Sequence, residues 1–130
     1  MSALLVAVGG AVGSVLRYWM SGMVQRFIPA PGTWAFFPAG TLAVNVLGCL
    51  IIGALAEVGD RRGPLSEEAR GLLMAGFLGG FTTFSAFANE TVTVWRHGTT
   101  GLSMAYVAAT VVLCLSATVA GRGLIAAILR

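Results

Sequence analysis

The sequence predicts an all-α membrane protein whose single domain, residues 1–130, consists of four transmembrane helices. The chain of 130 residues is 57% hydrophobic and only 10% charged, which excludes an ordinary soluble domain. Its apolar residues fall into four segments, about 3–25, 33–58, 71–95 and 102–129, each near or above the roughly 20 residues that span a bilayer. These segments occupy almost the whole chain, so no soluble catalytic domain remains.

The first segment combines small residues with one charge inside the apolar run. Gly9 and Gly13 are four residues apart, a spacing that lets another helix approach closely. Arg17 follows within the segment, and an intramembrane Arg is costly enough to indicate a function. Arg17 could instead snorkel to the interface from near the helix end, beside Tyr18 and Trp19.

The second segment follows a turn and carries an amide near its middle. Phe27–Pro38 contains Pro29 and Pro31, which are typical of a connection between spans. Asn45 lies in an otherwise apolar helix, where its side chain needs partners. These could be another helix or an anion that accepts from its NH₂ group, and Thr41 lies four residues earlier on the same face.

The third segment is predicted to be a broken helix. Its central stretch Gly76–Asn89 reads GFLGGFTTFSAFAN. About ten helical residues from the start of the segment rise roughly 15 Å, half of a hydrocarbon core about 30 Å thick, so Gly79–Thr83 is expected near the bilayer midplane. Unpaired backbone is tolerated there only inside protein or beside a polar cavity. Gly76 and Gly80 could simply form a tight helix contact, but packing does not require the hydroxyl residues that follow them.

Aromatic residues also recur along the third segment. Phe77, Phe81, Phe84 and Phe87 follow a spacing of three to four, which predicts one aromatic face. Such a face usually packs against a neighbour, yet ring edges carry partial positive charge, so Phe84 and Phe87 could also present edges to a small anion. Glu90 lies nearer the interface, where it could be a solvated or paired carboxylate or a functional one.

The fourth segment carries small polar side chains along one face. Ser103, Tyr106 and Thr110 occur at spacings of three and four, and Cys114 continues the series. An isolated Ser or Thr often bonds its own helix backbone, whereas a run that includes Tyr106 also suits a polar track. Cys114 and Cys49 are expected to be apolar packing residues instead of a disulfide.

The charges and the absence of reactive groups narrow the function. All eight basic residues are Arg and they are scattered, so a nucleic-acid-binding surface has no basis. Four spans put both termini and the Gly59–Arg70 loop on one side, which carries more Arg residues than the other and is expected to be cytoplasmic. No histidine near a nucleophile, midmembrane carboxylate pair or phosphate-binding loop is evident, so no enzyme is expected. The polar side chains, aromatic ring edges and single intramembrane Arg described above suit conduction of a small anion.

Three segments of this chain resemble a known family. Gly9–Tyr18, Gly40–Gly48 and Gly76–Phe87, one in each of the first three spans, are similar to the signature segments of the Fluc (CrcB) fluoride ion channel family. The resemblance implies a fluoride-selective channel that passively exports cytoplasmic fluoride across a bacterial cytoplasmic (inner) membrane. It also implies an antiparallel, dual-topology homodimer with two pores and a structural Na⁺ at the subunit interface.

The resemblance assigns roles to particular residues. Those implied for the anion pore are Asn45, Phe84, Phe87, Thr41, Ser85, Tyr106 and Thr110. The structural positions implied near the dimer centre are Arg17, Gly9, Gly13, Gly76 and Gly80. Backbone carbonyls of Gly79 and Thr82 are implied as the sodium ligands. Ala86 and Ala88 depart from the family pattern, which often has Thr and Ser there.

Two other functions fit four short spans. A proton-coupled exporter of the small multidrug resistance type needs a carboxylate inside the first span, but this chain has Arg17 there and no acidic residue before Glu57. A non-conducting membrane assembly subunit would use its glycines only to pack helices, and a flux measurement distinguishes it from a channel.

Overall fold

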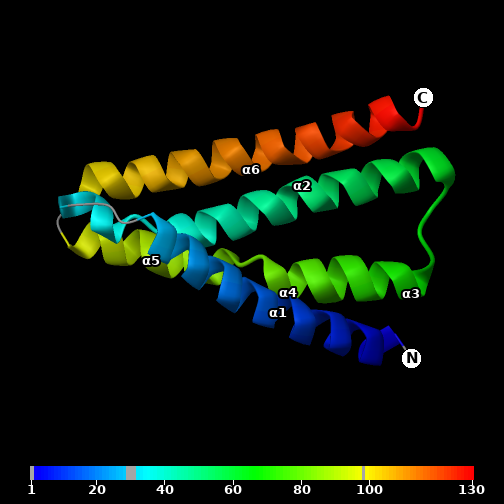
Figure 1. Cartoon of the computed structure of the whole chain (residues 1–130), viewed down its shortest axis with the longest axis horizontal. Helices are drawn as coiled ribbons and strands as arrows, with labels where there is room; N and C mark the ends of the chain where they lie inside the picture. Colours follow the sequence, from blue (N-terminus) through cyan, green and yellow to red (C-terminus); the bar gives the residue numbers. More distant parts are fainter. Residues whose placement is uncertain (1, 29–31, 98) are drawn as a thin grey trace.

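The computed structural model describes residues 2–28, 32–97 and 99–130, which form a bundle of long helices (Figure 1). In chain order the elements are α1 (Ser2–Phe27), the 3₁₀ turn η1 (Gly32–Phe36), α2 (Ala39–Arg62), α3 (Glu67–Ala69), the π-helical stretch η2 (Arg70–Leu78), α4 (Gly79–Phe81), α5 (Phe84–Arg96) and α6 (Thr100–Ile128). The stretch Glu67–Arg96, from α3 to α5, is called the third span below. It and three single helices, α1, α2 and α6, are long and apolar enough to cross a membrane. Pro29 and Pro31 of the predicted turn lie outside the described residues.

Two helices begin at positions that differ from the expected spans. The second span was expected from residue 33, but α2 begins at Ala39, because Pro38 disfavours helical backbone in the residue before it. The third span was expected from residue 71, but its helix begins at Glu67, where the Ser66 hydroxyl accepts a bond from the Ala69 N–H at 3.2 Å. Both termini and the connection between α2 and α3 lie at one end of the molecule (Figure 1).

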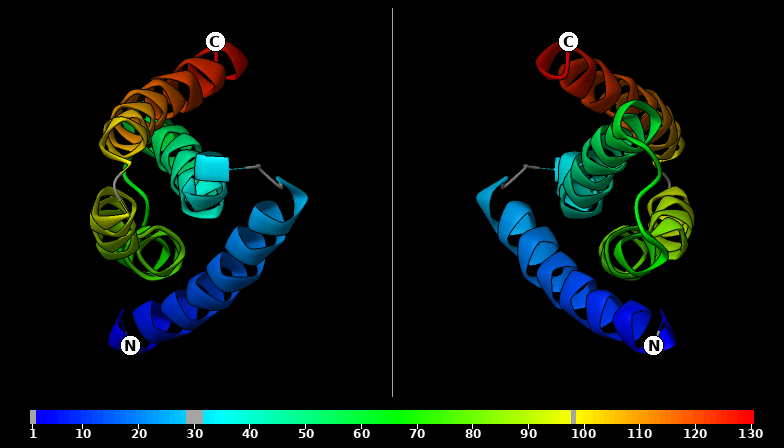
Figure 2. Two further views of the ribbon diagram at one scale, coloured as in Figure 1. Left: turned by 90° about the vertical axis from the view of Figure 1, so that its left-hand side faces the viewer. Right: turned by 90° about the vertical axis from the view of Figure 1, so that its right-hand side faces the viewer.

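The helices pack as two pairs, and the first pair is α1 with the third span (Figure 2). A Cβ atom added at Gly9 or Gly13 would meet main-chain atoms of η2, and one added at Gly80 would meet the backbone of Gly10. Gly76 faces the backbone of Val6 in the same way. The small residues on both helices therefore allow the two backbones to touch within one chain.

The second pair is α2 with α6, which run parallel (Figure 1). A Cβ at Gly53 would meet the carbonyl of Thr118, and a Cβ at Gly121 would meet the carbonyl of Leu50. Parallel helices require the chain to cross the bundle between them, and the third span makes that crossing.

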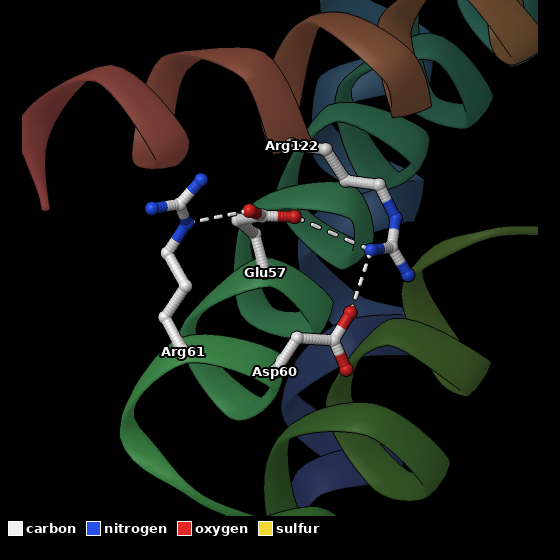
Figure 3. A network of polar contacts seen from close by, with 4 residues as sticks. All are labelled: Glu57, Asp60, Arg61 and Arg122. Atoms are coloured by element: carbon white, nitrogen blue, oxygen red, sulfur yellow. Dashed lines mark hydrogen bonds and ion pairs between the residues drawn. The ribbon is translucent and has the colours of Figure 1, made fainter. Parts of the chain in front are cut away.

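Charged side chains join α2 and α6 near the end that holds the termini (Figure 3). Glu57 accepts from Arg61 at 2.6 Å and from Arg122 at 3.3 Å, and Arg122 also donates to Asp60 at 2.8 Å. The Arg122 guanidinium is thus paired with carboxylates at this end of α6. Because the Arg and Asp side chains are well exposed, each pair adds little stability, but together they fix the register of the two helices.

The third span is broken at two residues. The backbone is extended at Thr82 (φ −87°, ψ 159°) and Thr83 (φ −152°, ψ 118°). The break was expected over Gly79–Thr83, but Gly79 and Gly80 remain helical, so that expectation was too broad. Gly80 is packed against α1, which favours helix there, and the hydroxyls end it: Thr82 bonds the Leu78 carbonyl at 2.9 Å.

Asn45 on α2 holds the broken backbone. Its Nδ2 donates to the Thr83 carbonyl at 3.2 Å, and its Oδ1 accepts from the Thr83 N–H at 2.9 Å. The Thr83 hydroxyl then accepts from the Ala86 N–H at 3.1 Å and caps α5. Asn45 is buried, so its two bonds replace those that water would make with this peptide group outside the bundle.

Replacement of Asn45 by Ala is expected to destabilise the fold by about 1–3 kcal/mol, because it leaves both main-chain groups of Thr83 unpaired in an apolar setting. Thermal unfolding of the protein in detergent, followed by tryptophan fluorescence, measures the loss. Asn89→Ala is the matched control, since Asn89 is exposed on α5. Equal melting temperatures for the two variants would contradict this role of Asn45.

Candidate functional site

A hollow of about 470 Å³ opens beside the helix break, between α2, the third span and α6. We call it the break hollow. Its walls include six of the residues to which the sequence assigned a role: Asn45, Gly79, Thr82, Phe84, Phe87 and Thr110. Thr41, Ser85 and Tyr106 are not part of its wall. The structure therefore brings the two predicted phenylalanines and the buried amide to one place.

The break divides the predicted aromatic face into two pairs. Phe77 and Phe81 stack with ring centroids 5.8 Å apart in the part of the third span that packs on α1. Phe84 and Phe87 follow the break, with centroids 5.5 Å apart and planes tilted by 52°. The expectation of one continuous face was wrong, because the extended residues at 82 and 83 change the direction of the helix.

The two rings after the break differ in exposure. Phe87 is buried at 9% exposure and lies 5.3 Å from the ring of Tyr106, whereas Phe84 is 79% exposed in the single chain. Tyr106 in turn meets Phe37 edge to face at 5.5 Å. A wall of aromatic rings thus separates the break hollow from the residues beyond it.

Beyond that wall, Glu90 connects three helices. One carboxylate oxygen accepts from Thr41 of α2 at 2.7 Å, and the other accepts from Tyr106 of α6 at 2.8 Å. Glu90 also lines a second hollow of about 340 Å³, formed with Phe36 and Phe37 and called the outer hollow below. Thr41 and Tyr106 are therefore brought together by a carboxylate that the sequence analysis did not assign to the site.

A signal for Glu90 was present in the sequence. It lies three residues after Phe87, one turn along α5, so the two side chains share a face. Its partners are separated from it by 49 and 16 positions, and only the folded chain shows that they meet.

The last three predicted residues differ in their burial and in their partners. Ser85 is exposed, and its hydroxyl is 3.2 Å from that of Thr83. Thr110 is 7% exposed, and its hydroxyl has no hydrogen-bond partner within the described part of the chain. Arg17 is half-buried on α1 and forms no ion pair with residues 2–28, 32–97 or 99–130.

The break also changes the bonding of main-chain oxygens. In a continuous helix the N–H groups of Thr83 and Ala86 would donate to the carbonyls of Gly79 and Thr82. Here they donate to Asn45 and to the Thr83 hydroxyl instead, so those two carbonyls lose their helical partners. Carbonyl oxygens are hard ligands, so their chemistry fits a small hard cation. No group of three or more His, Cys, Asp or Glu side chains that could hold a metal occurs among the described residues.

Comparison with known proteins gives full-length relatives. A family model described as "CrcB-like protein, Camphor Resistance (CrcB)" matches residues 4–122. A "Fluoride-specific ion channel FluC" of Rhizobium etli (strain CFN 42) is 47% identical over 129 residues, which cover 98% of each chain. The protein with the same description from Paracoccus denitrificans (strain Pd 1222) is 45% identical over 127 residues, 95% of this chain and 96% of the relative.

The residues matched by the family model reach into all four candidate spans. This chain therefore belongs to the CrcB (FluC) fluoride channel family.

Proposed function

We propose that this chain forms a fluoride-selective ion channel that exports cytoplasmic fluoride passively, down its electrochemical gradient. The observation that carries the proposal is the convergence of Asn45, Phe84 and Phe87 on one hollow at a helix break inside an apolar bundle. Relatives described as fluoride-specific ion channels, aligned over almost the whole chain, support the same function.

The chemistry of this hollow suits a small, strongly hydrated anion. A desolvated anion needs donors in place of its lost water. The Asn45 amide has a second N–H beyond the one that bonds Thr83, and the tilted phenylalanine pair offers ring edges with partial positive charge. None of these groups carries a full positive charge, so an ion can also leave.

Glu90 is proposed to act as a positioning residue at the outer hollow. It fixes the hydroxyls of Thr41 and Tyr106 at hydrogen-bond distance and orients the Tyr106 ring against Phe87. Each hydroxyl has a single proton and donates it to Glu90, so the role proposed for Glu90 is to hold the Tyr106 ring, and with it Phe87, in place.

The direction of transport follows from the membrane potential. A cytoplasm that is negative relative to the outside drives an anion outward by about 2.3 kcal/mol per charge for each 100 mV. Export then needs no coupled ion. A proton-coupled exporter is less suitable, since the first acidic residue of the chain is Glu57 at the far end of α2.

Liposomes that contain the purified protein are expected to release fluoride and to retain chloride. Phe84→Ile and Asn45→Asp should each slow fluoride release about fivefold or more, because loss of one favourable contact to a desolvated ion costs about 1–3 kcal/mol and 1.4 kcal/mol is a factor of ten. A fluoride electrode in the external solution measures the rate.

A matched control separates the pore from general damage. Phe27→Ile changes a phenylalanine that is 77% exposed, close to the 79% of Phe84. It should release fluoride at the unmodified rate. Unchanged release from Phe84→Ile and Asn45→Asp would reject the pore residues, and absence of release from the unmodified protein would favour the non-conducting assembly subunit.

We further propose that two copies assemble antiparallel and complete two pores. In the single chain Phe84 is 79% exposed and Gly79 is also exposed, so the break hollow lacks a wall on that side. A second copy turned over in the membrane would cover this surface and bring the two helix breaks together. Arg17 and the unpaired side of α1 would lie near the same interface.

Antiparallel pairing predicts that about half of the chains have their termini outside the cell. Epitope tags at both termini, labelled in intact and in permeabilised cells, measure the fraction. Labelling only after permeabilisation would contradict the antiparallel dimer and would agree with the Arg distribution, which favours cytoplasmic termini.

A structural Na⁺ is proposed at the meeting point of the two breaks. The carbonyls of Gly79 and Thr82, whose helical donors are diverted, would hold it, and the ion would supply positive charge at the centre of an anion-conducting assembly. The extended backbone at Thr82, capped on both sides by hydroxyls, keeps these oxygens in a fixed arrangement.

Sodium is expected to stabilise the assembled protein against heat. A ligand at 100 times its dissociation constant adds about 2.7 kcal/mol, so the melting temperature in detergent should be higher in NaCl than in choline chloride of the same ionic strength. Asn45→Ala should reduce the difference, because it frees Thr83 to rearrange. The same melting temperature in both salts would argue against the site.

A further inference from the structure

Two thiols that the proposed function does not use lie together in the wall of the break hollow. Cys49 of α2 and Cys114 of α6 are the only cysteines of the chain, both are free and half-buried, and both line this hollow. They come from two helices that pack against each other along this wall.

The packing of α2 on α6 explains why the thiols meet. Cys49 is one helical turn before Gly53, and Cys114 is one turn before Thr118. The Thr118 carbonyl faces Gly53 where the two backbones come close together. Glu57 is one turn after Gly53 and bonds Arg122, which is one turn after Thr118, at 3.3 Å. The cysteines therefore occupy matching positions of two parallel helices held in register on that side.

We propose that Cys49 and Cys114 form a two-coordinate site for a soft divalent d¹⁰ cation, with Hg²⁺ as its best ligand. Thiolates bind soft metals, and two of them around a divalent ion give a neutral complex that suits an apolar wall. A monovalent soft ion would leave one net negative charge there, and Zn²⁺ prefers four ligands, which the described residues do not supply.

Binding is a simple exchange of protons for metal. For each HgCl₂, two S–H and two Hg–Cl bonds break and two S–Hg bonds form, and two protons and two chloride ions leave. No electron is transferred, so no oxidant is needed. HgCl₂ is neutral, so it can partition into the apolar part of the membrane that surrounds the protein.

Occupation of the site should also block fluoride release, and this part rests on the proposed function. The metal would lie in the same hollow as Asn45, Phe84 and Phe87, and Thr110 is one turn from Cys114 on α6. A bound ion with its two sulfurs fixed would narrow the space that a fluoride ion needs.

Mercury binding is tested by titration of the reduced, purified protein with HgCl₂, followed by the ultraviolet absorbance of mercury–thiolate bonds and by the number of free thiols. The expected result is saturation at one Hg²⁺ per chain with loss of both thiols. Cys49→Ser and Cys114→Ser should bind Hg²⁺ through one thiol and lose it to glutathione at a concentration at least tenfold lower than the unmodified protein. Saturation at two Hg²⁺ per chain, or equal retention by the single variants, would overturn the chelating site.

The fluoride assay tests the block on the same samples. Release from liposomes, relative to each untreated protein, should fall at least tenfold with HgCl₂ for the unmodified chain and remain unchanged for Cys49→Ser/Cys114→Ser. Chelation without a fall in release would overturn the block. If the untreated protein released no fluoride, the proposed function would fail instead, and the titration would still decide whether the two thiols bind the metal together.

Discussion

The pair of hydrogen bonds between Asn45 and Thr83 is the interaction on which the rest of this structure depends. A helix that stops inside an apolar bundle leaves main-chain groups without partners, and the cost of each is of the order of a lost buried hydrogen bond. Asn45 provides one donor and one acceptor at the point where the chain is extended. This allows α5 to start in a new direction, which carries Phe84, Phe87 and Glu90 to the face of α2 and α6. It also diverts the N–H group that would otherwise bond the Gly79 carbonyl. The Asn45 side chain thus affects both the position of the phenylalanines after the break and the bonding of the Gly79 carbonyl.

Four spans, their number and their approximate positions could be predicted because hydropathy and length are properties of each segment alone. The location of the break was predicted only to within five residues. Gly76 and Gly80 form the tight helix contact that was the alternative to a break at these residues: α1 packs on them, and packing outweighs their low helix propensity. The hydroxyl groups of Thr82 and Thr83, which bond the neighbouring backbone, decide where the helix stops.

Only part of the candidate site could be predicted from the sequence. Asn45 and the phenylalanines stand out in an apolar sequence, and family resemblance assigned them to a pore. Glu90 did not stand out, because a carboxylate near an interface has an ordinary explanation, and its role depends on Thr41 and Tyr106, which come from other helices. The same is true of Cys49 and Cys114, each of which looks like a packing residue until α2 and α6 are placed side by side. The pattern of residues within one segment does not predict which residues of distant segments will be in contact.

The pairing of α1 with the third span and of α2 with α6 has a consequence for synthesis in the cell. The first two helices of the chain, α1 and α2, do not have each other as their main packing partner. The ribosome must therefore complete the third span before α1 can pack, and it must complete α6 before α2 can pack. Until then Asn45 lacks its partner Thr83, and Glu57 lacks its partner Arg122. Chains that end before residue 100 should therefore be poor substrates for assembly and good ones for membrane quality-control proteases, which would remove incomplete channels before they conduct.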